Sequence, residues 1–500
     1  MKIATIYSRA SSGIDAPLIH VEAHLSNGMP QFSIVGLPET AVKESKDRVR
    51  SALLNTYFTF PHGKIIINLA PADLPKEGSR FDLAIALSIL AASGQIPTHD
   101  LAQYEFIGEL GLSGSVRPVL GILPLALQTQ KTNRILVLPS ENASEASLVE
   151  HLSILPIQHI LDISAHLRGE TIIHPFESNI PLNETLVDEL DLQDIKGQIL
   201  GKRCLEIAAA GGHSLLMIGP PGTGKTMLAN RLPSIMPVMT QQEAIESAAI
   251  QSISHQGFNS KNWKKRPFRS PHHSASSIAL VGGSTPPKPG EISLAHQGIL
   301  FLDELSEFKR DVLEALREPM ESGKITIARA ACQTEFPANF QLIAAMNPCP
   351  CGYLGDPEIL CRCSPMQIQR YRIKISGPIL DRLDMYIEIP RSHYKIFSES
   401  SMSETSGMIR QRVIRARDRQ LERSGKINAQ LTSKELKSLV QLTSSQQELL
   451  TDAFQKLHLS ARSYHRILKI ALTISDLAHA EKIETPHLIE AISFRKLTME

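Results

Sequence analysis

An eight-residue motif, GPPGTGKT at 219–226, constrains the fold of this chain more than any other stretch. It follows the apolar run SLLMIG and precedes a helical pattern, which is the strand–loop–helix context of a phosphate-binding loop. Glycines let backbone N–H groups turn inward around phosphate oxygens, the lysine reaches the outer phosphates, and the threonine hydroxyl can ligate magnesium. We therefore expect the nucleotide to be bound by Gly219, Pro220, Pro221, Gly222, Thr223, Gly224, Lys225 and Thr226.

Polar residues end two further apolar runs. GILFLDE closes with Asp303 and Glu304, and FQLIAAMN closes with Asn347. In a P-loop enzyme the aspartate holds Mg²⁺ while the adjacent glutamate can polarise the attacking water, and the asparagine amide can orient that water. An acidic strand end in solvent and an ordinary turn asparagine are the alternatives. The pattern predicts an ATPase with Lys225, Asp303, Glu304 and Asn347 in the reaction, and Mg²⁺ held by Thr226 and Asp303.

The order of the elements predicts several domains. At 500 residues the chain exceeds what one hydrophobic core usually serves. We expect an α+β domain over 1–170, a linker over 171–190, an α/β core with a mostly parallel sheet over 191–390 and a helical domain over 391–500. Alternation from Ile19 to Val35 on both sides of Asn27-Gly28 predicts a β-hairpin in the first domain.

Composition limits where the protein acts. The 52 basic and 51 acidic residues leave a formal charge of +1, so any grip on nucleic acid must come from local patches. The apolar run from Leu83 to Ala92 is too short to span a bilayer and is interrupted by Ser88. We read it as a buried helix in a cytoplasmic protein without membrane association. Six cysteines, four of them clustered, do not resemble a secreted disulfide framework.

The four clustered cysteines lie in CPCGYLGDPEILCRC, at 349–363. Cys349 and Cys351, then Cys361 and Cys363, form two C-x-C pairs, and four thiolates are what tetrahedral structural zinc requires. Reduced thiols without metal are the alternative, because C-x-C is a looser signal than C-x₂-C. A metal here would brace the loop that leaves Asn347 rather than do chemistry, since four protein ligands leave no open position.

Two segments are candidates for holding DNA. KNWKKRPFRS combines basic side chains with Trp263 and Phe268, as a strand-holding loop needs, although a solvated basic loop or a structural strand fits the composition equally. The stretch from Ser322 to Phe340 alternates about a turn and predicts a second β-hairpin. The basic residues of the two segments are Lys261, Lys264, Lys265, Arg266, Arg269, Lys324 and Arg329.

Together with GPILDRLD (377–384) and ARSYHRILK (461–469), these motifs make essentially the whole chain resemble the ComM/YifB family of magnesium-chelatase-like AAA+ ATPases. The resemblance implies a homo-hexamer that hydrolyses ATP between subunits. It also implies a helicase that promotes branch migration or unwinding of branched DNA in natural transformation, with single-stranded and branched DNA and recombination proteins as partners. It assigns Arg382 as an arginine finger and Arg462 as sensor 2; Arg466, one turn further along the same face, is the alternative sensor.

Two segments of the first domain, at 75–82 and 108–126, resemble the Lon-type protease domain, whose fold is S5-like. That protease uses a serine and a lysine. Matching the motifs places Arg80 at the serine position, one residue from Ser79, and Leu123 at the lysine position. Because a leucine cannot take a proton, we expect a retained fold without peptidase activity.

Two other functions remain open for an ATPase of this kind. One is a metal-insertion subunit acting on a tetrapyrrole, as magnesium chelatases do. The other is a protein remodeller or chaperone, whose ATP turnover would respond to protein and not to DNA.

Overall fold

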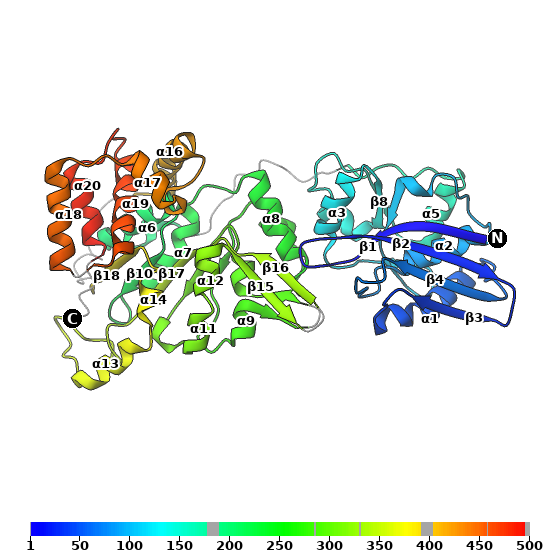
Figure 1. Ribbon diagram of the computed structural model, residues 1–500, viewed down its shortest axis with the longest axis horizontal. Helices are drawn as coiled ribbons and strands as arrows, with labels where there is room; N and C mark the ends of the chain where they lie inside the picture. The colour runs from blue at the N-terminus through cyan, green and yellow to red at the C-terminus, as the bar shows by residue number, and fades with distance from the viewer. Residues whose placement is uncertain are drawn as a thin grey trace.

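The computed structural model describes residues 2–177, 190–284, 287–329, 332–391, 404–457 and 459–495. Figure 1 shows three regions along the long axis: an N-terminal region at the right, a central region, and C-terminal helices at the upper left. Most of the predicted linker, at 178–189, lies outside the described residues. Within the described ranges, no helix has the length and apolar character needed to cross a membrane.

The N-terminal region is built on a seven-stranded mixed sheet, in the order β3-β4-β2-β1-β5-β8-β9. Its strands and those of a small ribbon are β1 (Lys2–Arg9), β2 (Leu18–Ser26), β3 (Gln31–Val35), β4 (Lys64–Ala70), β5 (Tyr104–Phe106), β6 (Glu109–Leu110), β7 (Val116–Arg117), β8 (Ile135–Pro139) and β9 (Ile154–Ile157). Its helices are α1 (Thr40–Asn55), α2 (Asp82–Ala92), α3 (Ile122–Lys131), α4 (Ser140–Ala146) and α5 (Ile160–Leu167).

The predicted hairpin around Asn27-Gly28 is wrong. Strands β2 and β3 both form, but β4 lies between them, antiparallel to β2 and parallel to β3. The reason is burial: β4 alternates, and Ile65, Ile67 and Leu69 all lie in the core. With β2 on one side and β3 on the other, the backbone N–H and C=O groups of β4 are hydrogen-bonded along both edges. If β2 paired directly with β3, the apolar strand β4 would lie at the edge of the sheet with one row of these groups unpaired.

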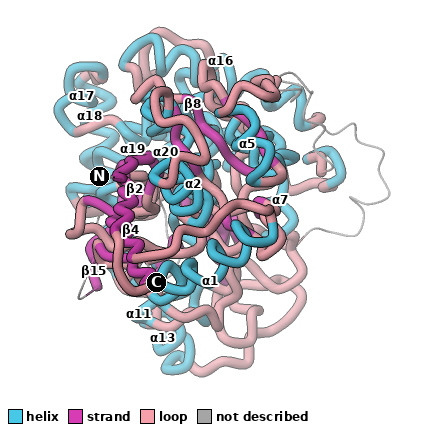
Figure 2. The backbone as a smooth tube through the Cα atoms, turned by 90° about the vertical axis from the view of Figure 1, so that its right-hand side faces the viewer, coloured by secondary structure: helices cyan, strands magenta, loops and turns pink. Residues whose placement is uncertain are grey.

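Helix α2 confirms the prediction of a buried helix. Every residue from Asp82 to Ala92 is buried, and the helix packs against β1 and β2. In Figure 2 it lies beside β2 and β4 at the front of the molecule. A helix that is apolar all round needs such a complete covering.

The central region contains a five-stranded sheet, in the order β11-β14-β17-β10-β18, and every neighbouring pair is parallel. Its strands are β10 (Leu215–Ile218), β11 (Phe268–Arg269), β14 (Ile299–Leu302), β17 (Gln341–Met346) and β18 (Met385–Glu388). Two ribbons accompany it: β12 (Gly282–Gly283) with β13 (Lys288–Pro289), and β15 (Lys324–Arg329) with β16 (Cys332–Pro337). The parallel sheet is confirmed, and so is the second hairpin within 322–340.

Helices cover this sheet and form the C-terminal region. The central helices are α6 (Ile199–Gly211), α7 (Lys225–Ile235), α8 (Gln241–Ser252), α9 (Ser277–Val281), α10 (Glu291–Leu294), α11 (Arg310–Glu314), α12 (Arg317–Ser322), α13 (Pro365–Ile373) and α14 (Gly377–Leu380). The C-terminal ones are α16 (Ser406–Ser424), α17 (Ser433–Leu439), α18 (Ser444–Lys456), α19 (Ala461–Leu477) and α20 (Thr485–Ser493). Helix α16 packs on α6 and α7, and α19 packs on α6. The chain is thus mixed α/β with a helical C-terminal region.

The N-terminal and central regions meet through α3 and α8 (Figure 1). The backbone N–H of Gly121 donates to Ser252 O at 3.0 Å, and that of Leu123 donates to Ser252 Oγ at 3.3 Å. One apolar cluster spans this junction and joins Leu123 to Trp263. The side chains of both regions therefore share one core at this point.

Candidate active site

The phosphate-binding motif forms the turn between β10 and α7. Gly224 caps α7 with φ 87°, and Gly222 has φ 77°, both in the left-handed region that favours glycine. Beyond the chain neighbours, no atom lies within 4 Å of where a Cβ would stand on either residue, so the backbone conformation, and not a close contact, favours glycine there. Backbone N–H groups at the start of a helix, with the helix dipole behind them, form a cradle for phosphate.

Lys225 lies at the centre of this cradle and is 8% exposed. Its Nζ donates to Gly219 O at 2.7 Å and to Pro220 O at 2.9 Å, and lies 3.3 Å from Asn347 Oδ1. Burial lowers the pKa of Lys225, although Asp303 acts in the opposite direction. The predicted lysine and the predicted sensor asparagine are therefore in contact.

Sheet order explains why the remaining groups meet here. Strands β14, β17 and β10 are consecutive neighbours, so their carboxyl ends bring Asp303, Asn347 and the phosphate-binding loop to one edge. Thr226 Oγ1 donates to Asp303 Oδ2 at 2.7 Å. A hydroxyl and a carboxylate side by side, next to a phosphate cradle, fit the oxygen ligands that Mg²⁺ takes together with water and phosphate.

Glu304 has a contact that the sequence did not reveal. Its backbone is in the left-handed region, φ 52°, and its N–H donates to Asp303 Oδ1 at 2.9 Å. Its Oε2 lies 3.1 Å from Nδ1 of His273. In the sequence, only the His272-His273 pair could have pointed to this contact. Nothing in the local pattern connects that pair with Glu304, about thirty residues further along the chain.

The arginines implied by the resemblance lie at the opposite edge of the sheet. Arg382 precedes β18, and its backbone oxygen accepts from Ser214 Oγ, just before β10 begins. The Arg382 guanidinium lies 2.6 Å from Glu321, and that of Arg462 lies 3.9 Å from the same carboxylate. The structure thus brings Arg382 and Arg462 together but not to Lys225 of the same chain, since the length of β10 separates the two edges.

Arg466 also reaches this edge. Its NH1 lies 3.5 Å from Asp384 Oδ1, and its side chain is 18% exposed against 61% for Arg462. Burial tends to raise the pKa of Asp384, but the charge of Arg466 and nearby groups lowers it overall. Among the described residues, Nε of Arg382 and NH1 of Arg466 have no hydrogen-bond acceptor. Both nitrogens are buried within the chain.

The basic segment at 261–269 differs from expectation. Trp263 is buried in the junction cluster, with its ring edge-on to Phe258, and Phe268 stacks on Phe301 at 5.9 Å. Trp263 is buried and Phe268 is half-buried, so for these two side chains the structure favours the structural strand that the composition equally allowed over stacking on bases. The structural alternative holds for them because β11 is part of the core sheet.

Two of the basic side chains in that segment have internal partners. Arg266 donates to Pro237 O, Gln297 O and Glu243, and Arg269 forms two hydrogen bonds to Glu291. The remaining basic residues, Lys261, Lys264 and Lys265, have no ion-pair partner in the described part of the chain. Lys261 and Lys265 are exposed and Lys264 is half-exposed, whereas the half-exposed Arg266 and Arg269 are engaged with carboxylates.

The β15–β16 hairpin presents Lys324, which pairs with Glu335 on the opposite strand at 2.7 Å and is exposed. The side chain of Arg329 lies outside the described residues. The contact of this hairpin with DNA stays a prediction.

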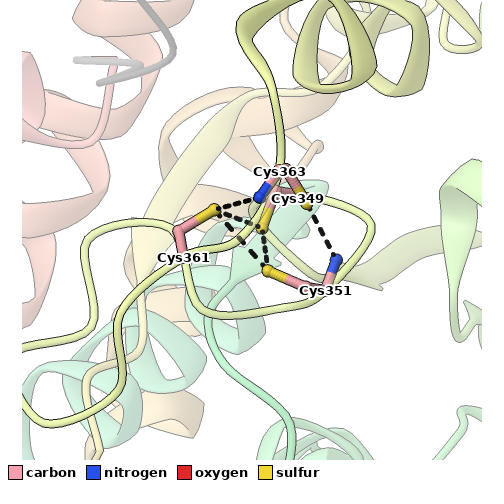
Figure 3. A group of neighbouring side chains, drawn as sticks. All are labelled: Cys349, Cys351, Cys361 and Cys363. Atoms are coloured by element: carbon pink, nitrogen blue, oxygen red, sulfur yellow. Dashed lines mark hydrogen bonds between the residues drawn. The ribbon is translucent and has the colours of Figure 1, made fainter.

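The four cysteine side chains lie close together in the loop that follows β17 (Figure 3). Cys349 Sγ lies 3.4 Å from Cys351 Sγ and 3.7 Å from Cys361 Sγ, and the latter two sulfurs are 3.5 Å apart. All four sulfurs lie within 4.8 Å of one another. Hydrogen bonds from backbone N–H groups, of which that of Tyr353 has the largest effect, lower the pKa of the Cys351 thiol to about 6. This donor set suits a thiophilic metal such as zinc.

In the N-terminal region, the two positions matched to the protease pair do not form such a pair. Leu123 is fully buried in the junction cluster, and Arg80 donates to Leu120 O at 3.4 Å. Ser79 Oγ donates to the Glu109 carboxylate. A serine bound to a carboxylate lacks the lysine base that this type of protease uses.

Three family models match the chain. Magnesium chelatase, subunit ChlI, matches residues 191–397; subunit ChlI of Mg-chelatase matches 21–142; and the ChlI C-terminal model matches 403–495. Competence protein ComM of Haemophilus influenzae is 51% identical, with 99% of this chain and 98% of that protein covered. Uncharacterized protein YifB of Salmonella typhimurium is 48% identical over the same shares. The magnesium-chelatase 67 kDa subunit of Heliobacterium mobile is 25% identical over 43% of this chain and 35% of that protein.

Proposed function

The chain belongs to the ComM/YifB family of magnesium-chelatase-like AAA+ ATPases, which implies ATP hydrolysis with Mg²⁺, and on this premise we propose that it is a ring-forming motor that moves branched DNA. The observation that carries the proposal is the full-length similarity to a protein named for competence. The motor would promote branch migration or unwinding during recombination in natural transformation, in the cytoplasm.

The separation of the two charged edges supports a ring, which we propose to be a homo-hexamer. The phosphate cradle lies at the carboxyl edge of the sheet, whereas Arg382, Arg462 and Arg466 lie at the amino edge. Arginines that stabilise the transferring phosphoryl group must reach it. In a head-to-tail ring the amino edge of one subunit faces the cradle of the next, so these arginines serve the neighbour's nucleotide.

Within each site we propose the following roles. Lys225 binds the outer phosphates, Glu304 orients the attacking water, and Asn347 positions both the water and Lys225. Thr226 and Asp303 would hold Mg²⁺, which offsets phosphate charge when bound. The helical C-terminal region then acts as the lid that carries the sensor arginine.

Lys261 and Lys265 are the proposed phosphate contacts to DNA, because both are exposed and no described carboxylate pairs with them. Lys264 and Lys324 are secondary candidates, the latter after release from Glu335. Each lost phosphate contact lowers the salt dependence of binding by about 0.9 in a log–log plot. Replacing Lys261 and Lys265 with Ala should therefore lower the slope by about 1.8, and Lys43→Ala with Lys482→Ala should not change it.

We further propose that the cysteine cluster holds structural zinc and that the N-terminal region has an S5-like fold without peptidase activity. Support for zinc comes from the convergence of four sulfurs. Support for a non-peptidase comes from Leu123, a buried leucine at the position matched to the lysine, and from Ser79, whose hydroxyl donates to Glu109. Casein hydrolysis that disappears in Ser79→Ala would contradict the second proposal.

The decisive experiment measures ATP hydrolysis by the purified protein without DNA, with single strands and with a four-way junction, while following the conversion of junctions to duplexes. Hydrolysis that rises with the junction, together with strand exchange, both lost in Lys225→Ala, is the expected result. Hydrolysis that responds to protein substrates but to no DNA would favour a remodeller. Hydrolysis that responds to a tetrapyrrole would favour a metal-insertion subunit.

A further inference from the structure

A cavity of about 730 Å³ lies between the amino edge of the central sheet and the C-terminal helices. One side is formed where strands begin: Gln297 and Gly298 precede β14, and Gln341 opens β17. The other side contains residues of α16 and α19, among them Arg417 and Lys469. The cavity therefore lies at the opposite end of the strands from the phosphate cradle, which follows the carboxyl end of β10.

The lining of this cavity carries more positive than negative charge. Its carboxylates are those of Glu243, Asp384 and Asp418. Its cations are Arg266, Arg382, Arg417, Lys426, Arg466 and Lys469. An excess of one sign of charge in a partly enclosed space attracts ions of the opposite sign.

Arg417 is the arginine of this lining that lacks a carboxylate. The residue is 8% exposed, and its Nε donates to Ala209 O at 2.9 Å. Its two terminal nitrogens have no hydrogen-bond or ion-pair partner in the described parts of the chain. By contrast, the other arginines of the lining each have a carboxylate: Arg266 with Glu243 at 3.1 Å, Arg382 with Glu321 at 2.6 Å and Arg466 with Asp384 at 3.5 Å.

The surroundings of Arg417 oppose its charge. Burial, together with the positive charge of Arg266, lowers the pKa of Arg417 to about 9, although Glu243 acts in the opposite direction. Glu243 is already engaged, because its Oε2 accepts from the backbone N–H of Thr240 at 2.9 Å as well as from Arg266. Two guanidinium groups thus share one carboxylate. A buried charge without a partner is strongly unfavourable, and an anion in the cavity would remove that cost.

We propose that Arg417, together with Arg266, forms a binding site for a small phosphate-bearing anion, separate from the phosphate cradle. A planar guanidinium offers paired N–H donors that match the oxygens of a phosphate group. A phosphate monoester carries about −1.5 to −2 charges at pH 7, which offsets part of the positive excess. An anion bound by both side chains joins α16 to the segment that precedes β11. This site does not depend on the proposed DNA motor.

The test measures the binding of inorganic phosphate, pyrophosphate and ADP by calorimetry, in a buffer free of other oxyanions and of magnesium. The full-length chain carries Lys225→Ala, so that neither its own cradle nor a neighbour's nucleotide contributes. We expect one equivalent of pyrophosphate per chain. Adding Arg417→Met should weaken this binding at least about tenfold, because a hydrogen bond to a charged group contributes at least that factor. Arg415→Met is the matched control, because Arg415 lies on the same helix, is exposed and does not line the cavity.

A second variant changes the charge in the opposite direction. Glu243→Gln removes the carboxylate that competes with the anion, and a glutamine can still cap α8. The affinity for pyrophosphate should therefore rise several-fold, which a misfolded chain could not show. Pyrophosphate should also raise the melting temperature of the Lys225→Ala chain, with or without Arg415→Met, but not that of the chain with Arg417→Met.

Three results would overturn the inference: no binding of phosphate or pyrophosphate at millimolar concentration, equal binding with Arg417→Met, or an unchanged affinity with Glu243→Gln. The ADP arm identifies the source of the phosphate group. Binding of ADP that is lost with Arg417→Met would support a nucleotide phosphate as the ligand. Binding limited to phosphate and pyrophosphate would support an inorganic ion.

Discussion

Removing one thiol from the cysteine cluster gives a sharp test of the zinc site. Zinc–sulfur bonds of about 2.3 Å place tetrahedral sulfurs about 3.8 Å apart. The observed separations of 3.4, 3.5 and 3.7 Å among Cys349, Cys351 and Cys361 are close to that spacing. We expect the protein, purified without chelator, to carry one zinc per chain, and Cys361→Ser to lose most of it.

The size of the effect follows from the loop that the metal closes. The ligands span residues 349–363. Cross-linking a loop of about 15 residues lowers the conformational entropy of the unfolded loop, which stabilises the folded loop by about 3 kcal/mol. The same free energy corresponds to roughly 100-fold in an equilibrium constant. Amides within 350–362 should therefore exchange hydrogen about 100-fold faster in Cys361→Ser, as measured by mass spectrometry.

The loop also touches the ATP site, which adds a functional readout. A Cβ on Gly352 would lie 2.7 Å from Pro221 Cδ, so the metal loop packs directly on the phosphate-binding loop. Loss of zinc should raise KM for ATP several-fold. Leu360→Ser, at an 87% exposed position of the same loop, should change neither exchange nor KM. Less than a tenth of an equivalent of zinc in the wild type, or unchanged exchange in Cys361→Ser, would refute the reasoning.

Three further predictions concern catalysis and stability. Lys225→Ala should lose nucleotide binding, whereas Glu304→Gln should keep it and lose at least about 100-fold in kcat; a full phosphate-release rate in either would disprove the assigned roles. Arg382→Ala and Lys225→Ala chains, each inactive alone, should regain ATPase activity when mixed, because one chain supplies the arginine and the other the cradle; a mixture as inactive as its parts would argue against a shared site. His213 is fully buried, and burial lowers its pKa to about 4, so the unfolded state takes up a proton below pH 6.5 that the native state refuses. Stability should fall by up to about 3 kcal/mol between pH 6.5 and 4, and thermal unfolding of His213→Gln should show a shallower decline over that range; equal slopes would contradict the assignment.

Local motifs made the ATP site predictable. The strand–loop–helix context of 219–226 fixes its own geometry, and the strands that end in Asp303 and Asn347 needed only the rule that parallel strands share a carboxyl edge. The buried helix over Leu83 to Ala92 was equally predictable, because a helix without a polar face must be surrounded by other parts of the protein.

Features that depend on pairing between distant segments could not be predicted. Strand β4 separates β2 from β3, and only the competition between possible sheet partners decides that. From composition alone, Trp263 and Arg266 belong to a candidate DNA-binding segment. In the structure Trp263 is buried in the apolar cluster that includes residues of α3, and Arg266 donates to the Glu243 carboxylate. The contact between His273 and Glu304 joins two strand ends, and no spacing in the chain encodes it.

The burial of Trp263 has a practical consequence, because it is the single tryptophan among 500 residues. Its indole sits in the apolar cluster where the N-terminal and central regions meet. Intrinsic fluorescence excited at the red edge of the absorption band therefore reports on one place in the molecule, without labels. An emission maximum that stays at short wavelength through the ATP cycle would mean that the junction between the two regions stays packed. A shift to longer wavelength would mean that Trp263 becomes exposed to water, and its rate would give the rate at which the two regions separate.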